Sequence, residues 1–194
     1  MNTTAHRTDF LNQLLSSRFN YWFGYVVNLS LVGWFGSHVV ADGRGLVSLP
    51  EAVLWAISGY LTWCIAEYLT HRYLYHNLAL LGIGHNLHHE NQRSLLGIPW
   101  YLTTLVILGI FHGLALVCQP ARLGLFMAFF WLFYIVYCWV HHCIHHVQFK
   151  NPFWRSLQKH HVLHHVRPDL NFSILMPVLD TLLGTRYQKR ERMK

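Results

Sequence analysis

Residues 121–146 read ARLGLFMAFFWLFYIVYCWVHHCIHH, an apolar run that ends in a cluster of histidines. Within 121–140 only Arg122 is charged, and the run has the length of about 20 residues that an α-helix needs to cross a bilayer core. Neutral imidazole is a good ligand for iron, zinc and copper. The segment therefore predicts a membrane-spanning helix that leads directly into a metal site.

Three further apolar stretches have a similar length and few charges. They cover residues 21–40, 50–70 and 99–118. Composition agrees with a membrane protein, because 53% of the residues are hydrophobic and only 12% are charged, whereas a soluble domain carries about 25% charged residues. We therefore expect an all-α membrane protein with four transmembrane helices, forming a single domain over residues 1–194.

Most of the 16 histidines fall in four short clusters beside these spans. The clusters are His71/His76, His85/His88/His89, His141/His142/His145/His146 and His160/His161/His164/His165. Four crossings would place all of them on one membrane face, as a histidine-rich helical cap. The opposite face carries only Arg44 and Arg122 as basic residues, so the positive-inside rule predicts that the histidine face is cytoplasmic. The host membrane would be the bacterial inner membrane or the endoplasmic reticulum.

Two clusters, at 85–89 and 161–165, have the form HxxHH. Positions i, i+3 and i+4 of a helix lie on one face, so three imidazoles can converge on a common volume. The cluster at 141–146 reads HHxxHH and offers two i,i+4 pairs, between which the spacing does not choose. These patterns predict that one face of each such helix supplies histidine ligands.

His71 and His76 are five residues apart, about 140° around an ideal helix. They can share a site only if the helix ends or bends between them, or they serve different ions. Glu67, one turn before His71, is expected either to orient an imidazole by accepting its ring N–H or to be a solvated helix-end carboxylate.

So many imidazoles need more than one ion. The chain has only 8 acidic residues and no HExxH motif, so neither a carboxylate-rich di-iron bundle nor a zinc-protease helix is indicated. Histidine ligation of two ions beside a bilayer favours a non-haem di-iron centre that activates dioxygen.

The motifs together resemble the fatty acid hydroxylase (sterol desaturase) superfamily of membrane dimetal enzymes. Residues 67–76, EYLTHRYLYH, resemble its EYxxHRxxxH box, and the HxxHH segments resemble two further boxes. Residues 137–146 are similar to its YDxxHYxxHH segment, with Cys138 where an aspartate is common. Asn171-Phe172 and residues 180–187 resemble the closing signature. The resemblance thus defines two histidine-box regions, 67–99 and 137–187.

The resemblance implies two iron ions and O2 as cofactors, with zinc able to replace iron in purified protein. The implied ligands are His71, His76, His85, His88, His89, His141, His145, His161, His164 and His165. His142 and His146 remain alternatives to His141 and His145, because the interval to the last box is one residue longer than in the acyl 2-hydroxylases. Glu67, Asn171 and Asp180 are expected to support the ligands.

The implied function is hydroxylation of a C–H bond in a membrane lipid, either a fatty acyl or a sphingolipid chain. A desaturase or a carotenoid or sterol oxidase would use the same scaffold, and a non-catalytic metal-binding membrane protein is the third interpretation. The chain has no haem-binding HPGG motif, so we expect a separate electron donor of the cytochrome b5 or ferredoxin type. Its basic residues flank apolar segments, which favours lipid over nucleic acid as a partner.

Overall fold

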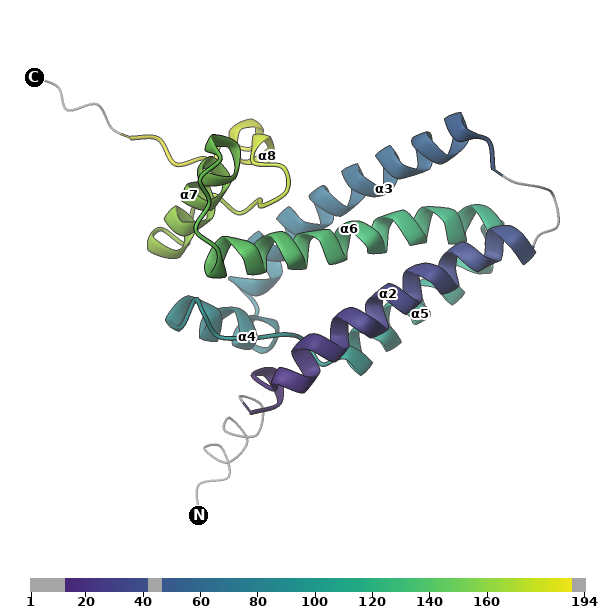
Figure 1. The fold of residues 1–194 in the computed structure, drawn as a ribbon, viewed down its shortest axis with the longest axis horizontal. Coiled ribbons are helices and arrows are strands. Elements are labelled where there is room, and N and C mark those ends of the chain that lie inside the picture. The colour runs from purple at the N-terminus through teal and green to yellow at the C-terminus, as the bar shows by residue number, and fades with distance from the viewer. Residues whose placement is uncertain (1–12, 42–46, 190–194) are drawn as a thin grey trace, which may run out of the picture. The chain divides into compact units, whose positions relative to one another are not determined.

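In the computed structural model, which describes residues 13–41 and 47–189, every regular element is a helix (Figure 1). The elements are α2 (Arg18–Ala41), α3 (Leu49–Leu69), the π-helix η1 (Thr70–Tyr75), α4 (Ala79–Glu90), α5 (Trp100–Ala115), α6 (Pro120–His146), α7 (Pro152–Val166) and α8 (Val178–Leu182). The prediction of an all-α protein is therefore confirmed for the described residues. Arg44, which entered the charge argument, lies outside them.

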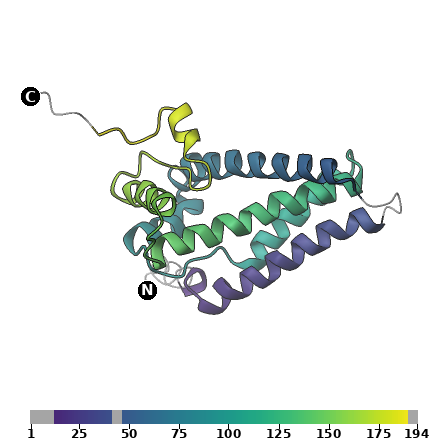
Figure 2. The ribbon, with the colours of Figure 1, turned by 45° about the horizontal axis from the view of Figure 1, so that its top comes forward.

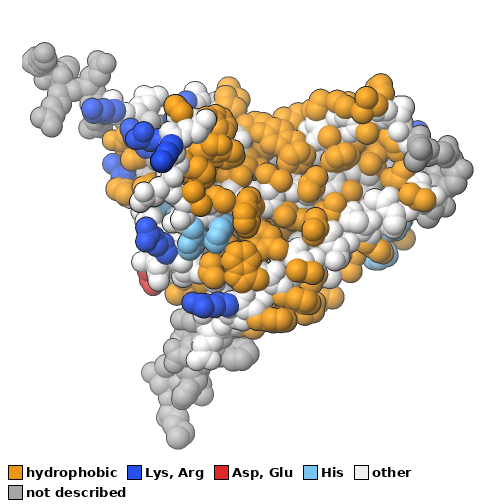
Figure 3. Space-filling view, in the orientation of Figure 1, with side chains coloured by type: hydrophobic (Ala, Val, Ile, Leu, Met, Phe, Trp, Pro, Cys, Tyr) orange, Lys and Arg blue, Asp and Glu red, His pale blue; other side chains and the backbone are white. Residues whose placement is uncertain are grey.

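Three helical segments are long and apolar enough to cross a membrane. They are Arg18–Val40, Leu49–Tyr75 and Pro120–His146, which coincide with three of the predicted spans. Only 22%, 22% and 28% of their most apolar windows are buried, so most of their apolar side chains face outward. Figure 3 shows this apolar surface over α2, α3 and α6. Exposed apolar surface of this extent is typical of helices that face lipid.

The remaining predicted span, 99–118, is a shorter apolar helix. α5 has 16 residues, so it is about 24 Å long, against about 30 Å for a bilayer core. Its last turn gives way to a tight connection before α6 starts at Pro120. The four-span topology and the cytoplasmic side of the histidines stay predictions.

The described helices form two compact units. Unit 1 comprises the chain up to Trp63 together with Glu90–Val136, and unit 2 comprises Cys64–His89 and the chain from Tyr137 onward. α3 and α6 contribute residues to both units. The prediction of a single domain over 1–194 stays a prediction.

Unit 1 is held by apolar packing and by close approaches of its helices. Its buried core consists of Leu31, Phe35, Ile107, Phe111, Leu123, Met127 and Trp131. α2 and α5 lie side by side in both views (Figures 1 and 2). α3 meets α6 at Gly59, where an added Cβ would lie 2.7 Å from Cβ of Phe129. α6 meets α2 at Gly124 in the same way, against the carbonyl oxygen of Phe35. Small residues at such crossings are typical of membrane helices.

Unit 2 has a small apolar core and many connecting hydrogen bonds. The core residues are Val140, Ile144, Leu157 and Ile174. α7 begins at Pro152, a favoured first helical residue, after Asn151, whose side chain accepts the backbone N–H of Phe153 at 2.9 Å. The Gln158 side chain of α7 donates to the carbonyl oxygen of Ile144 at 2.6 Å. The end of α6 and the start of α7 are thus fixed to each other.

Candidate metal centre

The π-helix η1 brings His71 and His76 together. A π-helix bonds residue i to residue i+5 and has more residues in each turn, so side chains five apart lie closer to one face than the about 140° of an α-helix. His71 lies in η1, and His76 directly follows it. The two imidazole rings stack with centroids 5.3 Å apart and an interplanar angle of 24°. If His71 and His76 share a site, their spacing requires the helix to end or bend between them. The change from α-helix to π-helix meets this requirement.

Each HxxHH motif divides between two places. On α4, His85 and His89 lie together while His88 points to a second cluster. On α7 the division is reversed, because His164 joins the first cluster, and His161 and His165 join the second. The three histidines of one motif, which the spacing allows to converge on one volume, are thus divided between two groups, since positions i+3 and i+4 lie about 100° apart around a helix.

The resulting clusters each contain five histidines. We call them the first group (His71, His76, His85, His89 and His164) and the second group (His88, His141, His145, His161 and His165). Each histidine offers one ring nitrogen, and the five nitrogens of a group all lie within 4.8 Å of one another. Every one of these residues belongs to unit 2.

α6 contributes His141 and His145, and the other pair of its HHxxHH motif lies elsewhere. His142 and His146 stack on each other with ring centroids 4.3 Å apart and belong to neither group. His146 is exposed. Of the two alternatives that the sequence left open, the structure thus brings His141 and His145 next to the other histidines.

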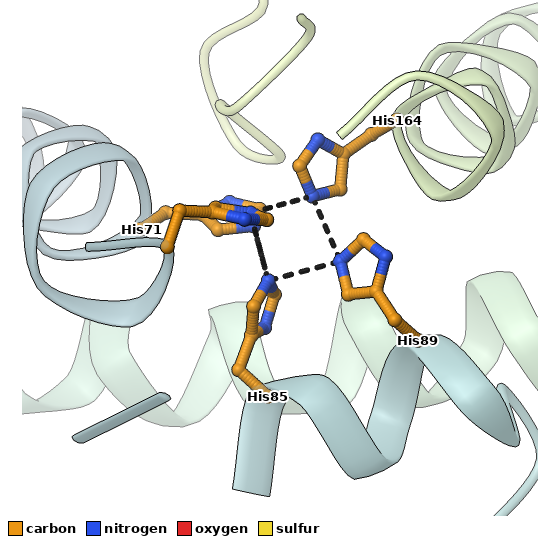
Figure 4. A group of neighbouring side chains, drawn as sticks. His71, His85, His89 and His164 are labelled. Atoms are coloured by element: carbon orange, nitrogen blue, oxygen red, sulfur yellow. Dashed lines mark hydrogen bonds between the residues drawn. The ribbon is translucent and has the colours of Figure 1, made fainter. Parts of the chain in front are cut away.

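In both groups the Nε2 atoms converge. In the first group, Nε2 of His85 lies 3.0 Å from that of His89 and 3.2 Å from that of His71. Figure 4 shows these rings and His164 directed at a common centre from η1, α4 and α7. In the second group, Nε2 of His141 lies 2.9 Å from that of His161 and 3.0 Å from that of His88.

These separations fit metal ligation. Two imidazole nitrogens bound at right angles to an ion, each at about 2.1 Å, are about 3.0 Å apart. The donor set is all nitrogen, which suits iron and zinc and is unsuited to magnesium or calcium. Each group is therefore able to hold a metal ion.

Burial favours the neutral form of five histidines of the two groups that lie outside the candidate spans. It lowers the pKa of His88 and of His164 to about 3, that of His89 to about 4, and that of His165 to about 2. The pKa of fully buried His161 also lies well below its usual range. In each case desolvation of the protonated ring is the main cause, and neighbouring imidazoles add to it. Neutral imidazole retains the lone pair that a metal ion needs.

The segment after α7 supports the first group through its backbone. Nδ1 of His71 is hydrogen-bonded to the carbonyl oxygen of Phe172. Nδ1 of His164 lies 2.8 Å from the carbonyl oxygen of Leu170. Between them Asn171 adopts a positive φ of 58°, a conformation that Asn tolerates better than most residues. A histidine that donates Nδ1–H in this way presents the lone pair of Nε2.

The three residues expected to support the ligands are all buried in unit 2. Asp180 accepts the backbone N–H of Phe172, and Asn171, which lies between the two carbonyls, accepts the backbone N–H of Tyr187. Glu67 accepts the backbone N–H groups of Ile174 and Leu175, not the ring N–H of a histidine. Glu67 thus ties the end of α3 to the backbone at Ile174 and Leu175. It is only 3% exposed, so it is not a solvated helix-end carboxylate.

Two features of the site were not predicted from the sequence. The carbonyl groups of Leu170 and Phe172 carry no side-chain signal, although Asn171 marks a position where the backbone can turn. His160, assigned no role, has its Nε2 3.0 Å from the Asp180 carboxylate and belongs to neither group. Because His160 directly precedes an HxxHH motif, the spacing alone did not distinguish it from the three histidines of that motif.

Known proteins resemble much of this chain. Two dihydroceramide fatty acyl 2-hydroxylases of Arabidopsis thaliana match it: FAH2 is 29% identical over 157 residues, and FAH1 is 30% identical over 176 residues. The matches cover 75% and 85% of this chain, and 65% and 73% of the relatives. The fatty acid 2-hydroxylase of Rattus norvegicus is 28% identical over 131 residues, which is 60% of this chain. The chain thus spans less than two thirds of FAH2 and 35% of the rat protein.

The fold is also found in a solved structure. Full-length scs7p, in which only the hydroxylase domain is visible, aligns over 85% of this chain and 67% of its own, with a TM-score of 0.70 and 21% identity. The family model for fatty acid hydroxylases matches residues 56–185, more than half of the chain and all ten histidines of the two groups. This chain therefore belongs to the fatty acid hydroxylase family.

Proposed function

We propose that this chain is a membrane di-iron oxygenase that hydroxylates a fatty acyl chain of a membrane lipid. The observation that carries the proposal is the pair of five-histidine groups within unit 2. The relatives are acyl 2-hydroxylases, two of them acting on dihydroceramide. We therefore propose carbon 2 of an acyl chain, in a sphingolipid or a similar lipid, as the position that is oxidised.

We assign one iron ion to each group, with the ten Nε2 atoms as ligands. When bound, the two ions would supply the activation of dioxygen. The reaction consumes one O2, two electrons and two protons, and converts a C–H bond into C–OH with release of water. The electrons would come from a separate donor of the cytochrome b5 or ferredoxin type.

The residues of the chain have distinct tasks in this proposal. The imidazoles bind the ions in their neutral form, and η1 turns His71 and His76 to the same side. The segment 170–173 orients two of the rings. The outward-facing apolar side chains of the candidate spans keep the chain in the bilayer that holds its substrate. We propose four crossings, with the histidines on the cytoplasmic side.

Comparative lipid mass spectrometry tests this function. The intact chain is expressed in a host beside His88→Ala and His164→Ala, which remove one ligand from each group. His142→Ala is the matched control, because it removes a histidine that belongs to neither group. We expect a lipid that gains one oxygen, on carbon 2 of its acyl chain, with the intact chain and the control only.

The other outcomes identify the competing functions. A histidine-dependent lipid that has lost two hydrogens would make the chain a desaturase. A product that disappears equally in His142→Ala would overturn the ligand assignment. Bound iron without any oxidised lipid, in the presence of dihydroceramide and a working donor, would favour a non-catalytic metal-binding protein.

A further inference from the structure

The two histidine groups differ in how their rings are held. In the first group, His71 and His164 have Nδ1 hydrogen-bonded to backbone carbonyl oxygens. In the second group, Nδ1 of His161 and Nδ1 of His165 are buried and have no hydrogen-bond partner among the described residues. Two rings of the first group are thus anchored on the side away from the convergence point, and two rings of the second group are not.

The difference affects which tautomer each ring prefers. An Nδ1–H that donates to a carbonyl fixes the neutral tautomer in which Nε2 has a free lone pair. His71 and His164 are in this state before any ion binds. For His161, both tautomers remain accessible, because Nε2 also lies 3.0 Å from that of His145 and can donate to it. Ion binding by the second group must therefore select a tautomer and fix the rings, which costs binding free energy.

The anchoring carbonyls are themselves fixed by a buried carboxylate. Asp180, which is fully buried, accepts the backbone N–H of Phe172 at 2.8 Å and that of Ser173 at 2.9 Å. The Thr185 hydroxyl donates to it at 2.7 Å, and Nε2 of His160 lies 3.0 Å away. Four partners leave this carboxylate little freedom, so it holds the backbone at Phe172 in place.

Asn171 fixes the same segment from its other side. Its side-chain amide donates to the carbonyl oxygen of His160 at 3.0 Å and accepts the backbone N–H of Tyr187 at 2.8 Å. Its own N–H donates to the carbonyl oxygen of Thr185 at 2.8 Å. The segment between Leu170 and Ser173 is thus a rigid element and not a loose connection.

We propose that the segment 170–173, clamped by Asp180 and Asn171, is a positioning device that makes the first group the tighter of two unequal metal sites. The first group then fills first and releases its ion last, and the second group holds the exchangeable ion. Asp180 acts through the carbonyl of Phe172 on His71, so it is a positioning residue and not a ligand. This inference rests on the proposed two-ion centre.

Metal release from the full chain in detergent tests the inference. The protein is loaded with zinc, which has no redox chemistry, and its content is measured before an excess of a chromophoric chelator is added. We expect two zinc ions per chain, released in two phases of one ion each. His85→Ala should abolish the slow phase, because it removes a ligand of the first group, and His141→Ala should abolish the fast phase.

Asp180→Asn should accelerate the slow phase about 10–100-fold and leave the fast phase unchanged, which is the usual scale for losing a residue that orients a ligand. Asp169→Asn is the matched control, because Asp169 lies in the same connection but is exposed and forms an ion pair with Arg167 at 3.6 Å. The unchanged fast phase distinguishes positioning from general unfolding, which would speed both phases. Thr185→Val, which removes one donor to the carboxylate, should give a smaller acceleration of the slow phase alone and serves if Asp180→Asn does not fold.

The contrary outcomes are separable. Release of two ions in a single phase, or a slow phase that disappears in His141→Ala, overturns the inequality and leaves the proposed function intact. Equal acceleration of both phases in Asp180→Asn and in Thr185→Val overturns the positioning role. A folded chain that binds no zinc and no iron overturns the proposed metal centre, and this inference with it.

Discussion

Units 1 and 2 are built on different principles, although α3 and α6 contribute to both. Among the described residues of unit 1, the buried polar side chains are Asn20 and Asn28, and its core is apolar. Unit 2 buries histidines of the two groups together with the acidic residues Glu67 and Asp180. Apolar packing tolerates rearrangement, whereas a buried polar group that loses its partner remains unpaired at a cost of about 1–3 kcal/mol. We therefore expect unit 2 to respond to single-atom changes and unit 1 mainly to changes in side-chain volume.

The largest effect should come from His145 of α6, compared with its neighbour His146. His145→Ala removes an Nε2 atom that lies 3.1 Å from that of His88 and 3.0 Å from that of His161. We expect loss of the ion bound by the second group and a fall in lipid hydroxylation of about 100-fold or more, since an incomplete centre cannot activate dioxygen. His146→Ala should retain both ions and most of the activity, because His146 belongs to neither group. Metal content per chain and product formation, measured on both variants, check the prediction.

An inverted result would revise the ligand set. If His146→Ala lost the metal and His145→Ala kept it, the alternative pair would be the ligating one. α6 would then need to present its other i,i+4 pair to the histidines of α4 and α7, unlike the arrangement described.

The sequence predicted the apolar helices well because a bilayer imposes one length on every span. Residues 21–40, 50–70 and 121–140 follow from hydropathy alone, and each coincides with a candidate span. The span predicted at 99–118 was less accurate, since α5 stops at Ala115. The apolar run continues through Val117 and Cys118, but an apolar run does not specify the residue at which a helix ends in a turn.

The histidines were predictable by identity but not by arrangement. Spacing pointed to the HxxHH motifs, yet it could not reveal that His88 and His89 serve different groups. That division depends on the positions of other helices around α4, which are non-local. The spacing of His71 and His76 required an end or a bend of the helix between them, but it did not predict a π-helix. Backbone carbonyls, such as that of Phe172, leave no trace in a sequence because every residue has one.

A carboxylate in unit 2 should show the next largest effect. Glu67→Ala removes the acceptor of the N–H groups of Ile174 and Leu175 in a buried environment. We expect a loss of about 2–3 kcal/mol in the free energy of unfolding, because at least one N–H is left unpaired. Glu51→Ala, in the first turn of the same helix, should cost about 0.5 kcal/mol or less. Denaturant unfolding in micelles measures both, and equal losses would contradict the special role of Glu67.

Unit 1 should respond to added volume. Gly59→Ala places a Cβ 2.7 Å from Cβ of Phe129 and 2.8 Å from the backbone nitrogen of Phe130, so α3 and α6 must separate. We expect a destabilisation of about 1–2 kcal/mol from overpacking. Gly33→Ala is the matched control, since its Cβ would meet nothing within 4 Å, and it should be neutral or stabilise by about 0.5 kcal/mol. A neutral Gly59→Ala in the same unfolding assay would show that this helix contact is not tight.

The smallest effect should come from the buried polar pair of unit 1, Trp131 and Asn28. This pair allows a direct comparison of one hydrogen bond in each unit. Trp131 donates its ring N–H to the side-chain oxygen of Asn28 at 3.0 Å, and Asn28 donates in turn to the carbonyl oxygen of Gly24. A double-mutant cycle with Trp131→Phe and Asn28→Ala should give a coupling of about 0.6 kcal/mol, the average for such pairs between membrane helices, because the unfolded chain in lipid also finds partners. The same cycle on Asp180→Ala and Thr185→Val in unit 2 should give about 1.5 kcal/mol or more, because that hydrogen bond involves a buried carboxylate. Equal coupling in the two cycles would mean that polar contacts contribute alike in both units, and that only the histidines set unit 2 apart.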